Sequence, residues 1–396
     1  MRPSIRLGRI AGIQIGANAG VLVIVAILVF GLAAVRFPAA YPGRGSVAYL
    51  VAAVIAALLF FASLLAHEIA HALVARSNGV EVDSITLWLF GGVAQLRGEM
   101  RTPGAEFAVA VVGPLTSLVL GAFFGAAAVG LNAVGADGLV VSAAAYLALV
   151  NVLLAIFNII PAAPLDGGRV LRAALWKARG DRHAAAVTAA RAGRAFGYTM
   201  IGLGLVLVLF VGGLGGLWWA LIGWFLVHAA TAEEHHARLS QRLAGVRVAD
   251  VMSPQPVTAD PDAIVAAFID GVAMRERFST YPLTDSSGRL TGLVTLNRIR
   301  ALPWEQRGSV RLRDIACPPD EVPTARPAEP VMDVLPRLAG CTDGRAVAVD
   351  EAGRVIGLIS PSDISRALAL ADLRGAGRSP VSGADLSIFI AGPDRR

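Results

Sequence analysis

The residues best suited to chemistry are two histidines and a glutamate in one apolar stretch, His67-Glu68-Ile-Ala-His71. On a helix, residues four apart share one face, so both imidazoles can reach one metal ion. Glu68 then projects beside the ion, where its carboxylate can accept a proton from water. A bound zinc ion lowers the pKa of that water to about 7. The pattern therefore predicts a catalytic zinc site with Glu68 as the general base.

The His-Glu-x-x-His pattern also has two explanations that involve no metal. The pattern could arise by chance, or the histidines could hydrogen-bond to neighbouring helices of a bundle. The surrounding residues 60–74 are almost entirely apolar. A glutamate in such a stretch is costly and by default functional, which favours the metal site.

A catalytic zinc ion needs three protein ligands and one open position, so a third ligand must come from elsewhere in the chain. Asp166 is the natural candidate because it is the only acidic residue within positions 138–180. Pro161 and Pro164 end the helix before it, and Gly167-Gly168 allow a close turn. The alternative role of Asp166 is to cap the following helix, and spacing alone leaves both roles open.

These motifs resemble those of the site-2 proteases, a family of intramembrane zinc metalloproteases. The resemblance covers about residues 10–230 and is carried by four motifs: His67-Glu68-x-x-His71, Asn158-x-x-Pro161-x-x-Pro164-Leu165-Asp166-Gly167, Phe90-Gly91-Gly92 and Gly113-Pro114. It implies that His67, His71 and Asp166 bind one zinc ion and that Glu68 is the catalytic base. It also implies cleavage within transmembrane segments of substrates, such as anti-sigma factors or sigma-factor precursors, among which no residue here selects.

Two further elements are predicted to act in cleavage. The side-chain amide of Asn158 could donate a hydrogen bond to the oxygen that becomes negatively charged when water adds to a carbonyl. Its alternative role is an interhelical hydrogen bond. Residues 81–99 are typical of two short strands around a turn at Gly91-Gly92. Such a hairpin could hold an unwound substrate by strand addition, so we expect Gly91 and Gly92 to contact substrate.

A bundle of membrane-spanning helices must position these residues. The chain is 55% hydrophobic and only 16% charged, whereas soluble proteins are about a quarter charged. Stretches that are long and apolar enough to span a bilayer lie at 17–36, 47–75, 105–133, 139–160, 196–211 and 217–231. The glycines of 212–216 favour a turn between two helices over one broken helix. The predicted fold class is a polytopic α-helical membrane protein with about six transmembrane helices.

Loop charges predict the orientation of this bundle. Arginines crowd the N-terminus and the loops at 76–104 and 161–195, whereas 134–138 and 212–216 contain no Lys or Arg. By the positive-inside rule, both termini are cytoplasmic and the protein crosses the cell membrane several times. Membrane orientation also explains much of the net charge of +6, so we predict no nucleic-acid partner.

The composition becomes that of a soluble protein after residue 245. We divide the chain into a metalloprotease domain at 1–245, two α/β repeats at 246–305 and 306–371, and a disordered tail at 372–396. The repeats share their opening pattern, Val248-Ala-Asp250-Val251 and Leu312-Arg-Asp314-Ile315, and each ends in strands around a Gly-Arg turn.

The two cysteines, Cys317 and Cys341, imply no disulfide framework or thiolate metal site, which suits a cytosolic face.

The repeats resemble a tandem pair of cystathionine-β-synthase (CBS) domains. The resemblance implies a site for ATP, ADP or AMP, with Ser360 and Asp363 as ribose ligands in the second repeat. The first repeat has Thr295 but Arg298 in place of the expected Asp, so its site is doubtful unless Arg298 contacts phosphate. The alternative is a purely structural module or one that forms a homodimer.

The sequence as a whole favours an intramembrane zinc endopeptidase whose activity is modulated by adenine nucleotides. The alternative from another class is a membrane transporter or channel gated by nucleotide, in which Glu68 would act as a charge on an ion pathway. A third alternative, an inactive scaffold, fits poorly with the intact residues His67, Glu68, His71 and Asp166.

Overall fold

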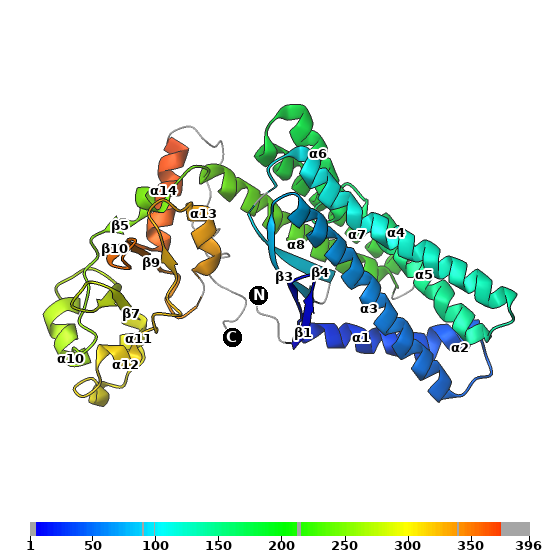
Figure 1. Ribbon diagram of the computed structural model, residues 1–396, viewed down its shortest axis with the longest axis horizontal. Helices are drawn as coiled ribbons and strands as arrows, with labels where there is room; N and C mark the ends of the chain where they lie inside the picture. Colours follow the sequence, from blue (N-terminus) through cyan, green and yellow to red (C-terminus); the bar gives the residue numbers. More distant parts are fainter. Residues whose placement is uncertain (1–4, 89–90, 99, 212–214, 339, 374–396) are drawn as a thin grey trace. The chain divides into compact units, whose positions relative to one another are not determined.

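The computed structural model describes residues 5–88, 91–98, 100–211, 215–338 and 340–373 (Figure 1). The chain divides into two compact units, of which the first ends at Ala237 and the second begins at Arg238. The first unit contains the apolar helices and the second contains the two repeats.

The first unit is a helical bundle. Its helices are α1 (Gly20–Gly31), α2 (Phe37–Ala40), α3 (Ser46–Ser77), α4 (Pro103–Ala133), α5 (Gly138–Asn158), α6 (Asp166–Arg179), α7 (Arg182–Val211) and α8 (Gly215–Arg242), which continues into the second unit. Among the described residues, six helices are long and apolar enough to cross a membrane, counting α1 and α2 as the single span Gly20–Ala40. The predicted polytopic helical class is thereby confirmed.

Helices α7 and α8 are separate and lie against each other. A Cβ added to Gly197 would lie 2.8 Å from the carbonyl oxygen of Gly223, and one added to Gly204 would lie 2.5 Å from that of Gly216. Such close approach is possible only where both helices present small residues. Both helices are longer than the predicted spans 196–211 and 217–231 because each continues into a polar segment.

A four-stranded sheet covers part of the bundle. Its strands are β1 (Ile5–Ile10), β2 (Ile13–Ala17), β3 (Glu81–Trp88) and β4 (Gly91–Arg97), in the order β1-β2-β3-β4. β2 and β3 are parallel, and the two outer pairs are antiparallel. Buried Ile13 and Ile85 pack on Ala72, and Leu87 packs near Leu64. The sheet is therefore held against α3, the helix that carries the His-Glu-x-x-His motif.

The predicted hairpin at 81–99 is present, but its glycines lie elsewhere than expected. Gly91 and Gly92 are the first residues of β4 and pair with Trp88 and Leu87, so they belong to the strand and not to the turn. The rest of the Phe90-Gly91-Gly92 motif falls on residues 89–90, which lie outside the described residues. The hairpin of β1 and β2 was not predicted; it turns at Ala11 and Gly12, both at positive φ, as two-residue hairpin turns require.

In the second unit, each repeat completes the sheet of the other. β5 (Ser253–Pro254), from the start of the first repeat, pairs with β10 (Val355–Ile359) of the second, which continues to β9 (Ala346–Val349) and β8 (Thr324–Ala325). β6 (Thr280–Thr284) pairs with β7 (Leu290–Thr295), and Leu293 of β7 bridges to Cys317 at the start of the second repeat. Short helices flank the strands, among them α11 (Leu296–Ala301) and α14 (Pro361–Leu373). The repeats thus pack as one module.

The two cysteines correct one sequence expectation. Cys317 and Cys341 are joined in a disulfide, with their Cα atoms 5.7 Å apart. No disulfide was expected because the sequence does not reveal that the bridge from Leu293 to Cys317 brings this position next to the loop before β9. The sulfurs and the Glu321 carboxylate also form a group of metal-ligand type, but the disulfide occupies both sulfurs.

Candidate metal centre

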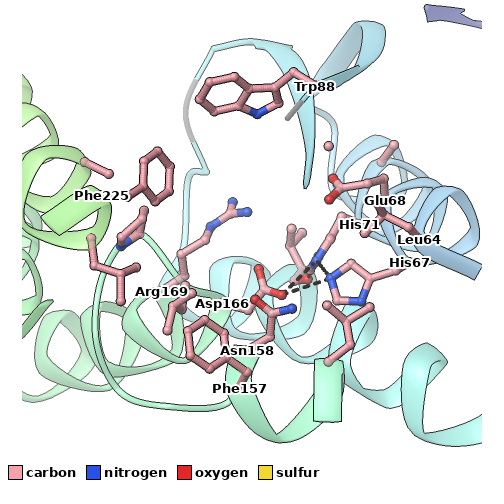
Figure 2. Close-up of a pocket in the computed structure, with 18 of the residues that line it drawn as sticks. Leu64, His67, Glu68, His71, Trp88, Phe157, Asn158, Asp166, Arg169 and Phe225 are labelled. Carbon is pink, nitrogen blue, oxygen red and sulfur yellow. Dashed lines mark hydrogen bonds and ion pairs between the residues drawn. The ribbon is translucent and has the colours of Figure 1, made fainter. Parts of the chain in front are cut away.

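Three of the predicted site residues converge in the first unit (Figure 2). His67 Nε2 and His71 Nε2, both from α3, lie 3.1 Å and 3.2 Å from Asp166 Oδ2 at the start of α6, and 3.1 Å from each other. Both imidazoles are buried. Ligands about 2.0–2.2 Å from a shared tetrahedral zinc ion lie roughly 3.3 Å apart, so this triangle has the dimensions of a zinc site.

Helix α4 fixes the orientation of both imidazoles. His67 Nδ1 lies 2.9 Å from Ser117 Oγ, and His71 Nδ1 lies 2.5 Å from the carbonyl oxygen of Val109. Because a carbonyl only accepts hydrogen bonds, His71 Nδ1 carries a proton, and in the neutral imidazole the lone pair is then on Nε2, the atom that faces Asp166. Hydrogen bonds of this kind to the second ring nitrogen are found at most metal-bound histidines.

The same helix leaves room for an ion. A Cβ added to Gly113 would lie 2.2 Å from His71 Nε2 and 2.6 Å from His67 Nε2, so any side chain there would fill the space between the nitrogens. Two neutral imidazoles and one carboxylate are a donor set that suits catalytic zinc. The residues present therefore fit a zinc ion.

A tight chain reversal brings Asp166 to the histidines. A Cβ on Gly167 would lie 2.2 Å from the carbonyl oxygen of Ile159, and one on Gly168 would lie 2.3 Å from the nitrogen of Ala163. Only glycine allows this close return of α6 to the end of α5. Helix α6 begins at Asp166 itself, without a side-chain cap, so the carboxylate meets the histidines instead of serving as the N-cap.

A cavity of about 530 Å³ opens beside this cluster. Its lining includes Glu68, Gly92 and Asn158, three further residues that the sequence singles out. A Cβ on Gly92 would lie 2.3 Å from Glu68 Cγ, so strand β4 passes directly over the Glu68 side chain. Gly92 is thus next to the cluster through the backbone of β4, and Gly91 precedes it on the same strand.

Asn158 does not make the interhelical hydrogen bond that was its alternative role. It is the last residue of α5 and lines the cavity, and its amide has no hydrogen bond to any residue within the described ranges. Asn151, earlier on the same helix, makes the helix contacts instead, donating to the carbonyl of Leu147 at 2.8 Å and to Ser63 Oγ at 3.4 Å. The Asn158 amide is therefore available to a ligand in the cavity.

Sequence reasoning missed a group of ion pairs that anchors α6. Arg172 of α6 pairs with Glu106 of α4, whose side chain is completely buried, and lies 3.3 Å from Glu233 of α8. On α7, Arg194 lies 2.8 Å from buried Glu234. The arginines of 161–195 were interpreted only as signals of orientation, although a glutamate in an apolar helix could have suggested a partner.

In the second unit, Ser360 and Asp363 lie at the start of α14 and form reciprocal hydrogen bonds. The Ser360 backbone N–H donates to Asp363 Oδ2 at 2.9 Å, and Asp363 N–H donates back to Ser360 Oγ at 3.3 Å. This is a capping box. Ser253 Oγ donates to the other carboxylate oxygen at 3.0 Å, so both oxygens of Asp363 have partners.

The corresponding position in the first repeat is built differently. Thr295 caps α11 by accepting from the Arg298 N–H at 3.4 Å. The Arg298 guanidinium donates to the carbonyl oxygens of Ile315 at 2.8 Å and Cys341 at 3.3 Å. The guanidinium therefore already has acceptors within the module and is not directed at a phosphate site. Nearby, burial lowers the pKa of Arg345 against the opposing effect of Asp343.

Comparisons with known proteins find relatives of both units. Residues 55–138 and 127–201 match Peptidase family M50, and residues 248–304 and 312–370 match the CBS domain. The chain is 46% identical to Rip3 of Mycobacterium tuberculosis, a protein named as a zinc metalloprotease, over 92% of this chain and 93% of the relative. It is 31% identical to the similarly named sll0528 of Synechocystis, over 93% and 96%.

A solved structure, the site-2 protease from Methanocaldococcus jannaschii, is 26% identical and covers 58% of this chain and 94% of its own, with a TM-score of 0.41. The relatives named above match along almost the whole chain, which sets aside the transporter and channel alternative. The chain belongs to peptidase family M50, the site-2 family of zinc metalloproteases, as a multi-pass membrane member with a C-terminal pair of CBS domains.

Proposed function

We propose that this protein is an endopeptidase that cleaves membrane-spanning segments of membrane-tethered proteins. In this proposal His67, His71 and Asp166 hold the zinc ion, and Glu68 is the catalytic base. The observation that carries it is the convergence of the three ligand atoms at a cavity that Glu68 also lines. The two histidines and Glu68 come from α3, which is long and apolar enough to span a membrane.

Each residue then has a step in peptide hydrolysis. A bound zinc ion would supply polarisation of the scissile carbonyl and a lowered pKa for water. Glu68 accepts the proton of the attacking water and delivers it to the amide nitrogen as the C–N bond breaks. Asn158 donates a hydrogen bond to the carbonyl oxygen, which becomes negatively charged when the water oxygen bonds to the carbon.

A matched pair of glutamate variants tests the role of Glu68. The probe is a leucine-rich peptide of about 25 residues in detergent micelles, with a central Asn-Gly-Pro helix break between a fluorophore and a quencher. Glu68→Gln should lose roughly 10²–10⁴-fold in cleavage rate and keep its zinc. Glu81→Gln, at an exposed position of β3, should cleave as the wild type does. A Glu68→Gln protein with undiminished cleavage would refute the proposal.

We infer that strand β4 holds the unwound substrate. Helical substrates hide their carbonyls in internal hydrogen bonds, so cleavage needs an extended segment. β4 is the last strand in the sheet order of the described residues, and an unpaired edge accepts an added strand. Gly91→Pro removes a backbone donor and should abolish cleavage without changing zinc content. Equal loss of zinc would contradict this role for the hairpin.

We propose that the substrates are membrane-tethered regulators such as anti-sigma factors or sigma-factor precursors. We also propose that both termini of this protein lie in the cytoplasm. The asymmetry of loop arginines supports this orientation. Single cysteines in a Cys317→Ser, Cys341→Ser background test it. In intact cells an impermeant thiol reagent should label Ala136→Cys, while Arg179→Cys should react only after lysis. The reverse pattern would invert the orientation.

We further propose that the CBS pair binds an adenine nucleotide beside Ser360 and Asp363 and thereby modulates cleavage. The match of both repeats to the CBS domain supports it. A nucleotide ribose would have to displace Ser253 from Asp363, so we expect binding at high micromolar to millimolar concentration. The full-length protein should gain thermal stability with AMP, ADP or ATP. Without a gain, a structural or homodimerising module is favoured.

A further inference from the structure

Arg169 stands out among the residues that line the cavity beside the metal cluster. It is the only Lys or Arg in the described lining. It follows Asp166 by three residues on α6, and residues three apart lie on the same helix face. The close-up shows its side chain extending into the cavity toward Trp88 (Figure 2). The helix that supplies the third ligand therefore also brings a guanidinium to the cluster.

The Arg169 guanidinium lacks the partners that its neighbours have. It makes no hydrogen bond or ion pair with any residue in the described ranges. Of the nearby acidic groups, Asp166 Oδ2 is directed at the two histidines, and Glu106 and Glu233 contact Arg172. A guanidinium offers five N–H donors, and leaving them unpaired at a half-buried position is unfavourable. Such a group is expected where a ligand supplies the acceptor.

The position of Arg169 relative to Glu68 indicates which atom this ligand presents. In the close-up Glu68 lies to the right of the His71–Asp166 contact and Arg169 to its left, while Asn158 lies below the Asp166 carboxylate (Figure 2). Water activated by Glu68 would attack a carbonyl carbon from the Glu68 side. A carbonyl attacked from that side can present its oxygen to Arg169 across the cavity.

We propose that Arg169 is a catalytic residue whose guanidinium donates hydrogen bonds to the oxygen of the scissile carbonyl while that oxygen carries negative charge. As the water oxygen bonds to the carbon, one proton passes to Glu68 and the C=O π pair moves onto the oxygen. When the C–N bond breaks, that pair re-forms the carbonyl and the nitrogen takes the proton from Glu68. Arg169 keeps its protons throughout. This inference rests on the proposed endopeptidase function.

Three variants on α6 measure the contribution of Arg169. Removing one donor to a developing oxyanion lowers kcat by roughly 10²–10³-fold. We expect Arg169→Gln to show a loss of that size, with KM changed less than about threefold and zinc content unchanged. Arg169→Lys should recover part of the rate because it restores the charge. Arg179→Gln, in the last turn of the same helix, should match the wild type.

Ligand binding gives a readout that does not depend on cleavage. The probe is a hexaleucine peptide whose central amide is replaced by a phosphinate, an anionic tetrahedral group. Titration calorimetry on zinc-loaded protein should show phosphinate affinity reduced about 100-fold by Arg169→Gln. The ordinary hexaleucine peptide, measured in a Glu68→Gln background, should bind equally with and without Arg169→Gln. Phosphinate binding without peptide cleavage in the wild type would count against the proposed function, whereas cleavage with unchanged phosphinate affinity in Arg169→Gln would count against Arg169 alone.

Four results would overturn the role of Arg169. Loss of zinc in Arg169→Gln would make Arg169 a positioning residue for Asp166. Equal weakening of the phosphinate and the ordinary peptide would make it a ground-state contact. Wild-type activity in Arg169→Gln would remove it from the reaction. A selective loss of cleavage for peptides with an acidic residue beside the scissile bond would make it a specificity residue.

Discussion

The metal cavity and the start of α14 both bring a carboxylate together with other polar side chains, but they use the hydrogen-bonding atoms in opposite ways. In the cavity, the Nε2 atoms of two histidines and the Asp166 carboxylate face a common point. At α14, Ser360 and Ser253 satisfy both oxygens of Asp363. The first set of atoms converges on a point where an ion can bind, whereas the second forms a closed set of hydrogen bonds.

This difference separates two motifs that look equally functional in the sequence. A His-Glu-x-x-His helix and a Ser-x-x-Asp helix start are both short patterns with a family precedent. The structure gives the second a sufficient structural role as a capping box, while the first converges with a distant carboxylate beside a cavity. The experiments below change one side of this contrast at a time.

The largest effect is expected at Gly113, which keeps space open between the histidine nitrogens. Gly113→Val should place a side chain where the ion would bind, because even a Cβ lies 2.2 Å from His71 Nε2. Zinc content, measured by mass spectrometry, should fall from about one per chain to almost none. Gly130→Ala on the same helix, with open space around the new Cβ, is the control. Zinc retained in Gly113→Val would place the ion elsewhere.

The next largest effect concerns the ion pair that anchors α6. Arg172→Met leaves the completely buried Glu106 without its main partner, and breaking a buried pair in this way costs about 3–5 kcal/mol. The free energy of unfolding in mixed micelles should fall accordingly. The double variant Arg172→Met/Glu106→Gln should recover much of it, since the uncompensated charge is gone. A double variant as unstable as the single one would contradict this role of the ion pair.

A smaller effect is expected at Ser117, which orients His67 from α4. Ser117→Ala removes the partner 2.9 Å from His67 Nδ1, and loss of such a contact typically lowers metal affinity about 10–100-fold. Competition with a zinc chelator measures the change. Thr116→Ala removes a hydroxyl that, among the described residues, bonds to Val112 of its own helix, and it should leave the affinity unaltered. An equal effect of both substitutions would indicate a general loosening of α4.

The smallest effect is expected in the CBS pair. Asp363→Ala removes the capping box of α14, and loss of a cap costs about 0.5–2 kcal/mol. The unfolding transition of the second unit should shift by that amount, with zinc content unaffected. If Asp363→Ala instead leaves stability unaltered but abolishes nucleotide-dependent stabilisation, Asp363 belongs with the ligand-binding residues and the contrast drawn above fails.

The sequence was sufficient wherever one helix or one short loop determines the geometry. The spacing of His67 and His71 fixes them on one helix face, and two prolines followed by Gly167-Gly168 imply a close return of the chain. Six apolar stretches likewise predict six helices, although their ends were missed because polar residues extend α7 and α8 beyond the apolar parts.

What the sequence could not provide depends on contacts between distant segments. Pairing of β2 with β3 joins residues about 70 positions apart, and the disulfide depends on a bridge between the two repeats. The position of Gly92 over Glu68 is set by strand register, which a hairpin motif alone leaves open. The specific roles of Arg169 and Arg172 could not be recognised in the sequence, because the loop at 161–195 contains many arginines that the positive-inside rule already explains.

Zinc content of the purified, detergent-solubilised protein tests the central claim most directly. The wild type should contain about one zinc ion per chain, and both His67→Ala and Asp166→Ala should lose it. Asp137→Ala, which removes the carboxylate that caps α5, should retain it. Folded wild-type protein that binds no zinc when zinc is supplied, or an Asp166→Ala protein that binds as much as the wild type, would contradict the assignment of the metal site.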